Sequence, residues 1–510
     1  MAREFVSCDR DQLLLMPPSL VEWLPADHLV WTVLGAVEQM DLDRFNAVYR
    51  LGAAGRPPLD PAMMVALLLY SYARGNRSSR GIERACWEDV AFKVITGMLT
   101  PDHSTIAEFR RRHELEICEL FDEVLGLCRE AGLVSVGVIT IDGTKIKANA
   151  SMDRNRDYRQ IATEILREAD ETDRREDELY GEARGDELPA ALRTPEGRRQ
   201  ALAEAKRRIA ERKGRTVSEA PEDGEVALDP WASVTGRGGR KEWLRAGRRD
   251  LERHRERQQR PIPRDHDERL FEAARRLEQS HQVEVATNAL YEQWRAGAVD
   301  RRGRRLHGIG LKPWSPPQIP AGTINTSDPD SRVMRTQGTP PRQAYNAQAA
   351  VNDRQVVLAA EVTNDAPDFG HLAPMLDTTI SQLAQVGVSD QPDVVLADAG
   401  YWHTAQLHAI TDRGIEVLVP PDGNQRAGIR PGWENGPYQE MRDRLATDHG
   451  RELYKQRKIT IEPVFGQIKH NRRIDRFMRR GRAAARSEWR LVTATHNLLK
   501  LHAHWTAAPA

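Results

Sequence analysis

Apolar residues recur at helical spacing through the first quarter of the chain. Residues 62–73 are almost wholly apolar, and Pro61 precedes them, where proline suits the first turn of a helix. Residues 80–91 and 105–127 continue the helical pattern. Short polar connections between these runs predict a compact helical domain over residues 1–132. Its pattern fits a DNA-binding helix-turn-helix arrangement and an ordinary helical bundle about equally well.

Strand patterns begin near Val134 and return in the last third of the chain. Residues 136–141 predict one strand, and residues 345–351 and 356–362 predict a hairpin. Residues 394–397 are wholly apolar, as in a strand buried on both faces. Helices predicted at 372–386, 404–411 and 461–473 alternate with these strands and with a further strand at 417–419. This order predicts an α/β domain built from residues 133–153 and 306–510.

The stretch between these two parts has a different composition. Residues 151–300 hold 31 Lys/Arg and 33 Asp/Glu, well above the 29% charged residues of the whole chain. Helical patterns run through 194–214 and 269–296. We therefore predict a helical, charge-rich insertion over residues 154–305. Its role stays open between shielding flanking DNA and mediating dimerisation.

The zero net charge of the chain does not exclude a nucleic-acid partner, because the charges are unevenly distributed. The formal net charge is +0, yet residues 451–510 carry 14 Lys/Arg against 4 Asp/Glu, a balance that suits a nucleic-acid backbone. The four cysteines form no CxxC pair, which argues against a zinc site or a disulfide framework. No apolar run approaches the roughly 18 residues of a membrane span, and the first residues lack an apolar signal segment. We expect a cytoplasmic protein without membrane segments.

Three carboxylates occupy positions where chemistry is often placed. Asp142 and Asp398 each follow an apolar strand run, and Glu462 opens the predicted helix 461–473 just before Pro463. Ligand sites of α/β sheets lie at the carboxyl ends of strands. Converging carboxylates need a cation, and Mg²⁺ prefers such oxygen ligands. Each residue alone also fits a turn or a helix start, so the pattern leaves the assignment open.

Several local sequences together carry a resemblance to a known family. They are TIDGTKIKANAS (140–151), NTSDPDSRVM (325–334), YNAQAAV (345–351), VLADAGYW (395–402) and YKQRKITIEPVFGQIKHNRR (454–473). In this order they resemble bacterial insertion-sequence transposases of the DDE type. The chain is most similar to insertion-sequence family eleven-eighty-two, whose members carry an InsH-like helical N-terminal domain. The resemblance covers nearly the whole chain and is weakest over the insertion.

The resemblance implies a fold, a reaction and its cofactors. It implies an RNase H-like core with a helical N-terminal domain, and a catalytic metal-binding triad of Asp142, Asp398 and Glu462. Two Mg²⁺ ions are expected, with Mn²⁺ able to substitute. The protein would bind the terminal inverted repeats of its element as a homodimer, cut the ends and join the 3′-hydroxyl to target DNA in the bacterial nucleoid. The alternatives are a metal-dependent nuclease on the same core and a catalytically decayed DNA-binding protein.

The resemblance also implies residues that contact DNA. Tyr454, Arg457, Glu462 and Lys469 match the family's Tyr-Arg-Glu-Lys signature in type, although the arginine stands one place early and Lys458 occupies the expected position. Lys469 follows Glu462 by about two helical turns, so the two share a helix face.

Further cations near these motifs could hold the DNA backbone. Lys145 follows Asp142 closely, and a basic track continues after Lys469. Its arginines are Arg472, Arg473, Arg476, Arg479, Arg480 and Arg482. A solvated basic surface is the alternative interpretation. For Tyr401 and Trp402 we favour packing over base stacking, and for Asp328 and Asp330 a structural role.

Overall fold

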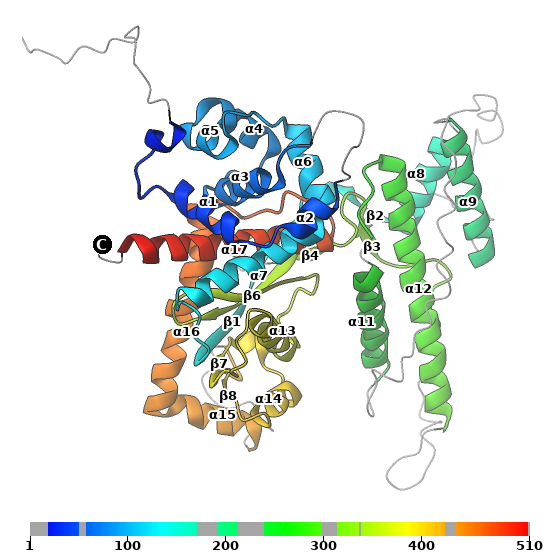
Figure 1. Cartoon of the computed structure of the whole chain (residues 1–510). Helices are drawn as coiled ribbons and strands as arrows, with labels where there is room; N and C mark the ends of the chain where they lie inside the picture. The colour runs from blue at the N-terminus through cyan, green and yellow to red at the C-terminus, as the bar shows by residue number, and fades with distance from the viewer. Residues whose placement is uncertain are drawn as a thin grey trace, which may run out of the picture.

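The computed structural model describes residues 19–49, 58–170, 192, 194–212, 239–258, 260–297, 314–335, 338–423 and 435–507. Figure 1 shows an N-terminal group of helices above a central sheet, and a second group of helices to one side. The helices of the described ranges include none that is both long and apolar enough to cross a lipid bilayer.

The N-terminal region is helical, as the apolar spacing predicts. Its elements are η1 (Leu20–Trp23), α1 (Leu29–Gln39), α2 (Asp43–Ala47), α3 (Pro61–Ala73), α4 (Ser79–Glu88), α5 (Val90–Thr96), α6 (His103–Arg112) and α7 (Glu114–Glu130). The single helix predicted over 80–91 is wrong in one respect, because the chain breaks at Asp89. The Asp89 carboxylate accepts a hydrogen bond of 2.7 Å from the backbone N–H of Ala91 and so caps a new helix.

The predicted α/β domain contains a mixed sheet of six strands. These are β1 (Val138–Lys147), β4 (Arg332–Met334), β5 (Arg342–Asn352), β6 (Val357–Thr363), β7 (Val394–Leu396) and β8 (Glu416–Leu418). The main path runs β4-β5-β1-β7-β8, and β6 also pairs with β5. The pairs β1–β5 and β5–β6 are antiparallel, whereas β1–β7 and β7–β8 are parallel. The predicted hairpin of β5 and β6 is confirmed.

The strand β1 is longer than its apolar run predicts. Its pairing with β5 continues to Lys147, while its parallel pairing with β7 ends at Thr140 opposite Leu396. The expectation that Asp142 ends a strand is therefore wrong. The polar residues after Ile141 stay in the strand because β5 still supplies hydrogen-bond partners on the other side.

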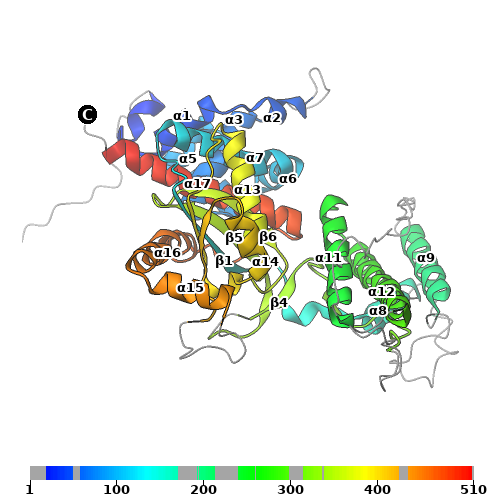
Figure 2. The ribbon, with the colours of Figure 1, turned by 90° about the horizontal axis from the view of Figure 1, so that it is seen from below.

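Helices cover both faces of the sheet. They are α13 (Leu372–Gln385), α14 (Thr404–Thr411), α15 (Pro437–Ala446), α16 (Asp448–Gly466) and α17 (Arg482–Ala507), with a short helix η4 (Ala399–Tyr401) and a π-helical turn η5 (Gln467–Asn471). In Figure 2, α13 and α16 lie on opposite sides of β1 and β5. The helix predicted to open near Glu462 opens instead at Asp448. There the Thr447 hydroxyl accepts a hydrogen bond from the N–H of Gly450, so Glu462 lies well inside α16.

The C-terminal helix α17 joins the N-terminal helices to the sheet. Its Trp489 donates from the indole nitrogen to the carbonyl of Gln348 on β5, at 2.9 Å. Its Asn497 side chain exchanges two hydrogen bonds of 2.8 Å with the backbone of Val357 on β6. Residues of α3, α7, the sheet and α17 belong to one continuous hydrophobic core. The N-terminal helices and the sheet are thus packed as one body.

The region between β1 and β4 forms a separate group of helices. Its elements are η2 (Met152–Arg154), β2 (Asn155–Asp157), α8 (Tyr158–Asp170), α9 (Pro195–Arg212), α11 (Arg240–Gln258), α12 (His266–Gly297) and β3 (Thr323–Asn325). It has its own core, which includes Tyr158, Ile161 and Leu270. The short strands β2 and β3 pair with each other, so the entry and exit of this insertion are held together at its base. The sequence analysis did not predict α11, because its charged residues hide a buried face with Trp243 and Leu251.

Candidate active site

Two of the predicted carboxylates lie where β1 and β7 separate. The parallel register ends at the pair Thr140 and Leu396, and Asp142 and Asp398 each follow two residues later. Burial raises the pKa of Asp142 to about 7, and the negative charge of Asp398 acts in the same direction. Two carboxylates that influence each other in this way form a site with a strong affinity for positive charge.

A positive charge is supplied from α16. The Arg457 guanidinium donates to the Asp142 carboxylate at 2.9 Å, and it lies 3.7 Å from the nearer oxygen of Glu462. Its side chain is only 12% exposed, whereas Glu462 is 56% exposed. Although burial opposes its charge, the neighbouring carboxylates, led by Asp142, raise the pKa of Arg457. Arg457 thus connects the predicted third carboxylate to the first.

The structure distinguishes Arg457 from Lys458, the two candidates for the signature cation. Arg457 faces the carboxylates and stacks over the ring of Tyr454, with 5.9 Å between the guanidinium carbon and the ring centroid. Lys458 is exposed. Successive helix residues point about 100° apart, so only one of them can face the sheet.

A fourth carboxylate, Asp368, lies beside this group and was missed by the sequence analysis. It accepts hydrogen bonds from Asn346 at 2.7 Å and from Gln348 at 2.8 Å, and it forms an ion pair of 3.2 Å with Lys145. Its charge also acts to raise the pKa of Asp142. In the sequence, Asp368 is marked only by its place in the polar stretch after β6. Its partners Lys145, Asn346 and Gln348 come together only through the pairing of β1 with β5, which the sequence does not reveal.

The site leaves no room for larger residues around Asp368. A Cβ atom added to Gly143 would lie 2.4 Å from the nearer oxygen of Asp368. A Cβ atom on Gly400, in the turn after Asp398, would lie 2.9 Å from the carboxylate of Asp398 itself. Small residues therefore let the carboxylates approach one another where β1 and β7 separate.

The cations predicted to contact DNA divide into accessible and buried groups. Lys469 lies on η5 and donates to the hydroxyl of Thr144 on β1, and burial lowers its pKa. Lys145 is occupied by Asp368. Arg473 is exposed and has a positive φ of 54°. Arg472 is only 5% exposed and donates to the carbonyl of Val492 and the hydroxyl of Thr495 on α17, which argues against a direct contact with DNA.

The remaining predicted residues have packing contacts. Tyr401 is buried and donates from its hydroxyl to the side chain of Gln348, and the indole of Trp402 meets the ring of Tyr438 edge-on. Asp328 accepts a hydrogen bond of 2.7 Å from Tyr345, and Asp330 pairs with Arg276 on α12. These contacts agree with the structural roles that the sequence analysis favoured.

The donor set suits a hard divalent cation in kind, because Asp142, Asp398 and Glu462 are all carboxylates. In the ranges that the structure describes, however, no three His, Cys, Asp or Glu side chains are grouped closely enough to hold a metal ion. Arg457 bridges Asp142 and Glu462 instead. A cation shared by the three carboxylates therefore requires Arg457 to release Asp142.

Comparison with known families identifies two segments of the chain. Residues 321–498 match the family described as "Transposase DDE domain", and residues 18–112 match "Transposase domain (DUF772)". Neither description names a particular insertion-sequence family. The first segment includes Asp398 and Glu462 but not Asp142, which precedes the insertion. Searches among curated proteins and among solved structures give no match.

Proposed function

We propose that this chain, whose two matched segments are transposase domains consistent with an insertion-sequence DDE transposase, uses Asp142, Asp398 and Glu462 as its catalytic triad. The transposase domains indicate a DNA transposase. The observation that carries the assignment is the position of Asp142 and Asp398 where β1 and β7 separate, with Glu462 linked to Asp142 through Arg457.

The sheet supports an RNase H-like core. Its strands follow the spatial order β6-β5-β1-β7-β8, in which the first three are antiparallel and the last three are parallel. If the short strand β4, which also pairs with β5, is left out, these strands are in chain order the third, second, first, fourth and fifth of the core, and the insertion lies between the first two. Helices connect the parallel strands, as crossover connections require.

In this proposal, divalent metal ions replace the guanidinium of Arg457 as the partner of Asp142. Asp142, Asp398 and Glu462 would hold divalent cations, for which we expect two Mg²⁺ ions with Mn²⁺ as a substitute. Such ions supply an activated nucleophile and stabilise the leaving oxygen of a displacement at phosphorus. In their absence Arg457 favours the ionised form of Asp142 and so partly opposes the burial that raises its pKa, since a guanidinium stabilises a paired carboxylate. Once released, the same guanidinium can donate to a DNA phosphate.

The reaction proceeds in two displacements. In the first, the oxygen of water bonds to the phosphorus at each element end, and the 3′-oxygen leaves with a proton. In the second, that 3′-hydroxyl bonds to a target phosphorus as the target's own 3′-oxygen leaves. Lys469, next to Thr144, holds a phosphate near the site. The N-terminal helices would bind the terminal inverted repeats, and joining two ends calls for a homodimer on DNA.

The test is cleavage and joining of DNA that carries the repeats of the element encoding this chain, in the presence of Mg²⁺. Wild type should give joined products, and Glu462→Gln should lose at least a hundredfold in rate. Glu452→Gln is the matched control, because Glu452 lies on the same helix but is exposed and paired with Lys455. Cleavage without joining would indicate a nuclease, and equal rates for Glu462→Gln and wild type would remove Glu462 from the site.

A further inference from the structure

The insertion and the C-terminal part of the core together enclose a basic pocket of about 480 Å³. We use the name basic pocket for the cavity lined by Asn149, Ala150, Ser151, Arg154, His266, Arg269, Thr326, Ser327, Arg476 and Arg480. Four of these residues are arginines, and none of them is acidic. The lining comes from the end of β1, from η2 and α12 of the insertion, and from the segment between η5 and α17.

The arginines of the basic pocket lack acidic partners. In the described part of the chain, no carboxylate lies within ion-pair distance of Arg154, Arg269, Arg476 or Arg480, and the guanidinium groups of Arg154 and Arg476 donate to no protein group. Arg480 donates only to the carbonyl of Asn149, at 3.1 Å. The backbone carbonyls of Pro263 and Arg264 accept from Arg269, whose Nε atom is buried without a partner. Donors gathered in this way fit an anion with several acceptor oxygens.

The positive charges of the basic pocket act on one another, as the pKa of Arg269 shows. Burial lowers the pKa of Arg269, and the positive charges of Arg480 and Arg154 lower it further, while Asp265 acts in the opposite direction. His266, the remaining titratable group of the lining, is 3.4 Å from Glu164. Asp265 near Arg269, and Glu164 and Glu168 near His266, still leave the four arginines with an excess of positive charge, which a bound anion would neutralise.

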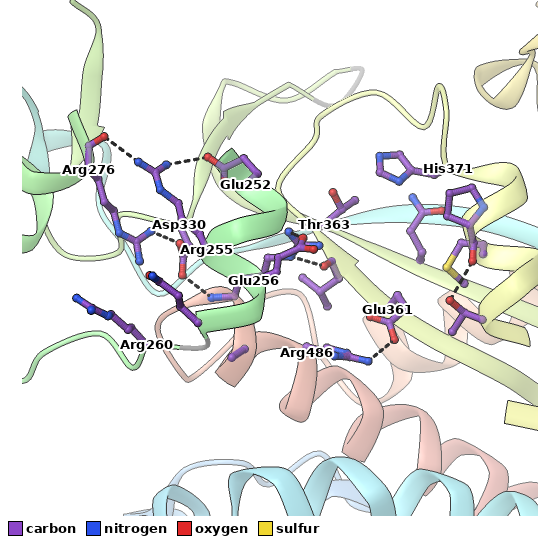
Figure 3. A pocket seen from close by; sticks show the side chains of 18 of the residues that line it. Glu252, Arg255, Glu256, Arg260, Arg276, Asp330, Glu361, Thr363, His371 and Arg486 are labelled. Atoms are coloured by element: carbon purple, nitrogen blue, oxygen red, sulfur yellow. Dashed lines mark hydrogen bonds and ion pairs between the residues drawn. The ribbon is translucent and has the colours of Figure 1, made fainter. Parts of the chain in front are cut away.

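A second cavity at the junction of the insertion and the core differs from the basic pocket, because its arginines have acidic partners. It has a volume of about 390 Å³ and contains arginines as well, but acidic side chains oppose them (Figure 3). Arg276 pairs with Asp330, Arg486 with Glu361, and Arg482 with Glu256. The pair of Arg482 with Glu256 joins α17 of the core to α11 of the insertion, whereas the pair of Arg486 with Glu361 lies within the core. Because these arginines already have acidic partners, they need no ligand. The two cavities therefore differ in charge, because only the basic pocket has no acidic residue in its lining.

The place of the basic pocket fits nucleic acid. The segment after η5 runs beside the end of β1, since Lys147 forms a bridge with Arg476, and its N–H donates to the carbonyl of Asp475 at 3.0 Å. Seven residues of extended chain separate Asp142 from Asn149, or roughly 23 Å. At about 3.4 Å per base pair this distance corresponds to roughly seven base pairs of DNA. The basic pocket thus lies just beyond the end of the strand that carries Asp142, within reach of a single duplex bound at the carboxylates.

We propose that the basic pocket binds a backbone phosphate of the DNA several base pairs away from the cut. This inference rests on the proposed function and extends it, because it assigns to the insertion a part in holding DNA. Arg154 and Arg269 come from the insertion, and Arg476 and Arg480 come from the core, so DNA in the pocket would clamp the two together. Serine and threonine hydroxyls of the lining add neutral donors to the same phosphate.

The test measures binding of duplex DNA without divalent cations, so that it does not depend on chemistry. Fluorescence anisotropy over a salt series compares wild type with Arg154→Gln/Arg476→Gln, whose side chains are exposed. Each lost phosphate contact lowers the slope of log affinity against log salt by about 0.9, or roughly eightfold in affinity between 1 M and 0.1 M salt. Because the basic pocket is proposed to hold one phosphate, we expect the slope to fall by about 0.9. Arg154→Lys/Arg476→Lys keeps both charges and should keep most of the slope.

The control is Arg207→Gln on α9, which removes the same kind of charge from an exposed residue paired with Glu204 and Glu211. Its affinity and slope should equal those of wild type. The proposal that the basic pocket binds a phosphate is refuted if the double glutamine variant has the melting temperature, the DNA affinity and the salt slope of wild type. Failure of wild type to bind any duplex would instead refute the proposed function.

Discussion

At the scale of single residues, the central feature is a buried carboxylate that is held close to other acids. Asp142 is 15% exposed, and its pKa of about 7 lies well above the ordinary value of 3.8. The folded state therefore binds a proton more tightly than the unfolded state between about pH 4 and pH 7. Without metal, stability falls as the pH rises through this window, and ionised Asp142 remains a cost above it.

We predict that Asp142→Asn stabilises the metal-free protein at pH 8 while it abolishes cleavage. A shift of about three units is worth at most roughly 4 kcal/mol, and we expect about 1–2 kcal/mol. Urea denaturation at pH 4 and pH 8 measures the effect, which should nearly vanish at pH 4, close to the ordinary pKa of 3.8. A variant less stable than wild type at pH 8 would show that the ion pair with Arg457 outweighs the burial of charge.

At the scale of secondary-structure elements, the insertion depends on its short base. Asn325 on β3 is buried and donates to the carbonyl of Ser151 at 2.7 Å and to the side chain of Asn155 at 2.9 Å. Its own oxygen accepts from the N–H groups of Ser327 and Asp328. One side chain thus holds both the entry and the exit of the insertion.

We predict that Asn325→Ala loosens the insertion and leaves the sheet intact. Removing one partner of several buried hydrogen bonds costs about 2–3 kcal/mol. Limited proteolysis should cut within residues 154–305 at least tenfold faster than in wild type, with the sheet protected. Asn471→Ala, which removes an exposed amide, serves as the control. Unchanged cutting in Asn325→Ala would show that the pairs between α11, α12 and the core suffice to hold the base.

The helices and strands that could be predicted from the sequence are those determined by the pattern of neighbouring residues. The apolar runs at β7 and α3 and the hairpin of β5 and β6 depend on neighbours in the chain. The continuation of β1 past Asp142 depends on β5, about 200 residues later, and the start of α16 depends on the cap at Thr447. Asp368 could not be found, since only the register of β1 against β5 brings Lys145, Asn346 and Gln348 to it.

At the scale of the whole molecule, α17 makes one body of parts that are distant in sequence. Its buried residues contact α3 and α7 on one side and the sheet on the other, and all share one hydrophobic core. The insertion has a core of its own. The N-terminal helices and the sheet should therefore lose their structure together, and the insertion should do so separately.

Native-state hydrogen exchange tests this prediction. Amides of α3, α7 and β5 should exchange with the same opening free energy, because their protection ends only in a shared unfolding event. Amides of α8 and α12 should exchange with an opening free energy lower by at least about 2 kcal/mol. If α3 and α7 exchange through an opening of their own while β5 stays protected, the two parts are independent in stability.

The most direct test of the proposed triad exchanges a carboxylate for a thiolate. Thiolate is a softer ligand than carboxylate, so it binds Mg²⁺ poorly and Mn²⁺ better. Asp142→Cys and Asp398→Cys should therefore lose cleavage and joining in Mg²⁺ by at least a hundredfold, and Mn²⁺ should restore at least a tenth of the wild-type rate. Activity in Mg²⁺ equal to that of wild type, or no recovery with Mn²⁺ in either variant, would contradict metal binding by these two aspartates.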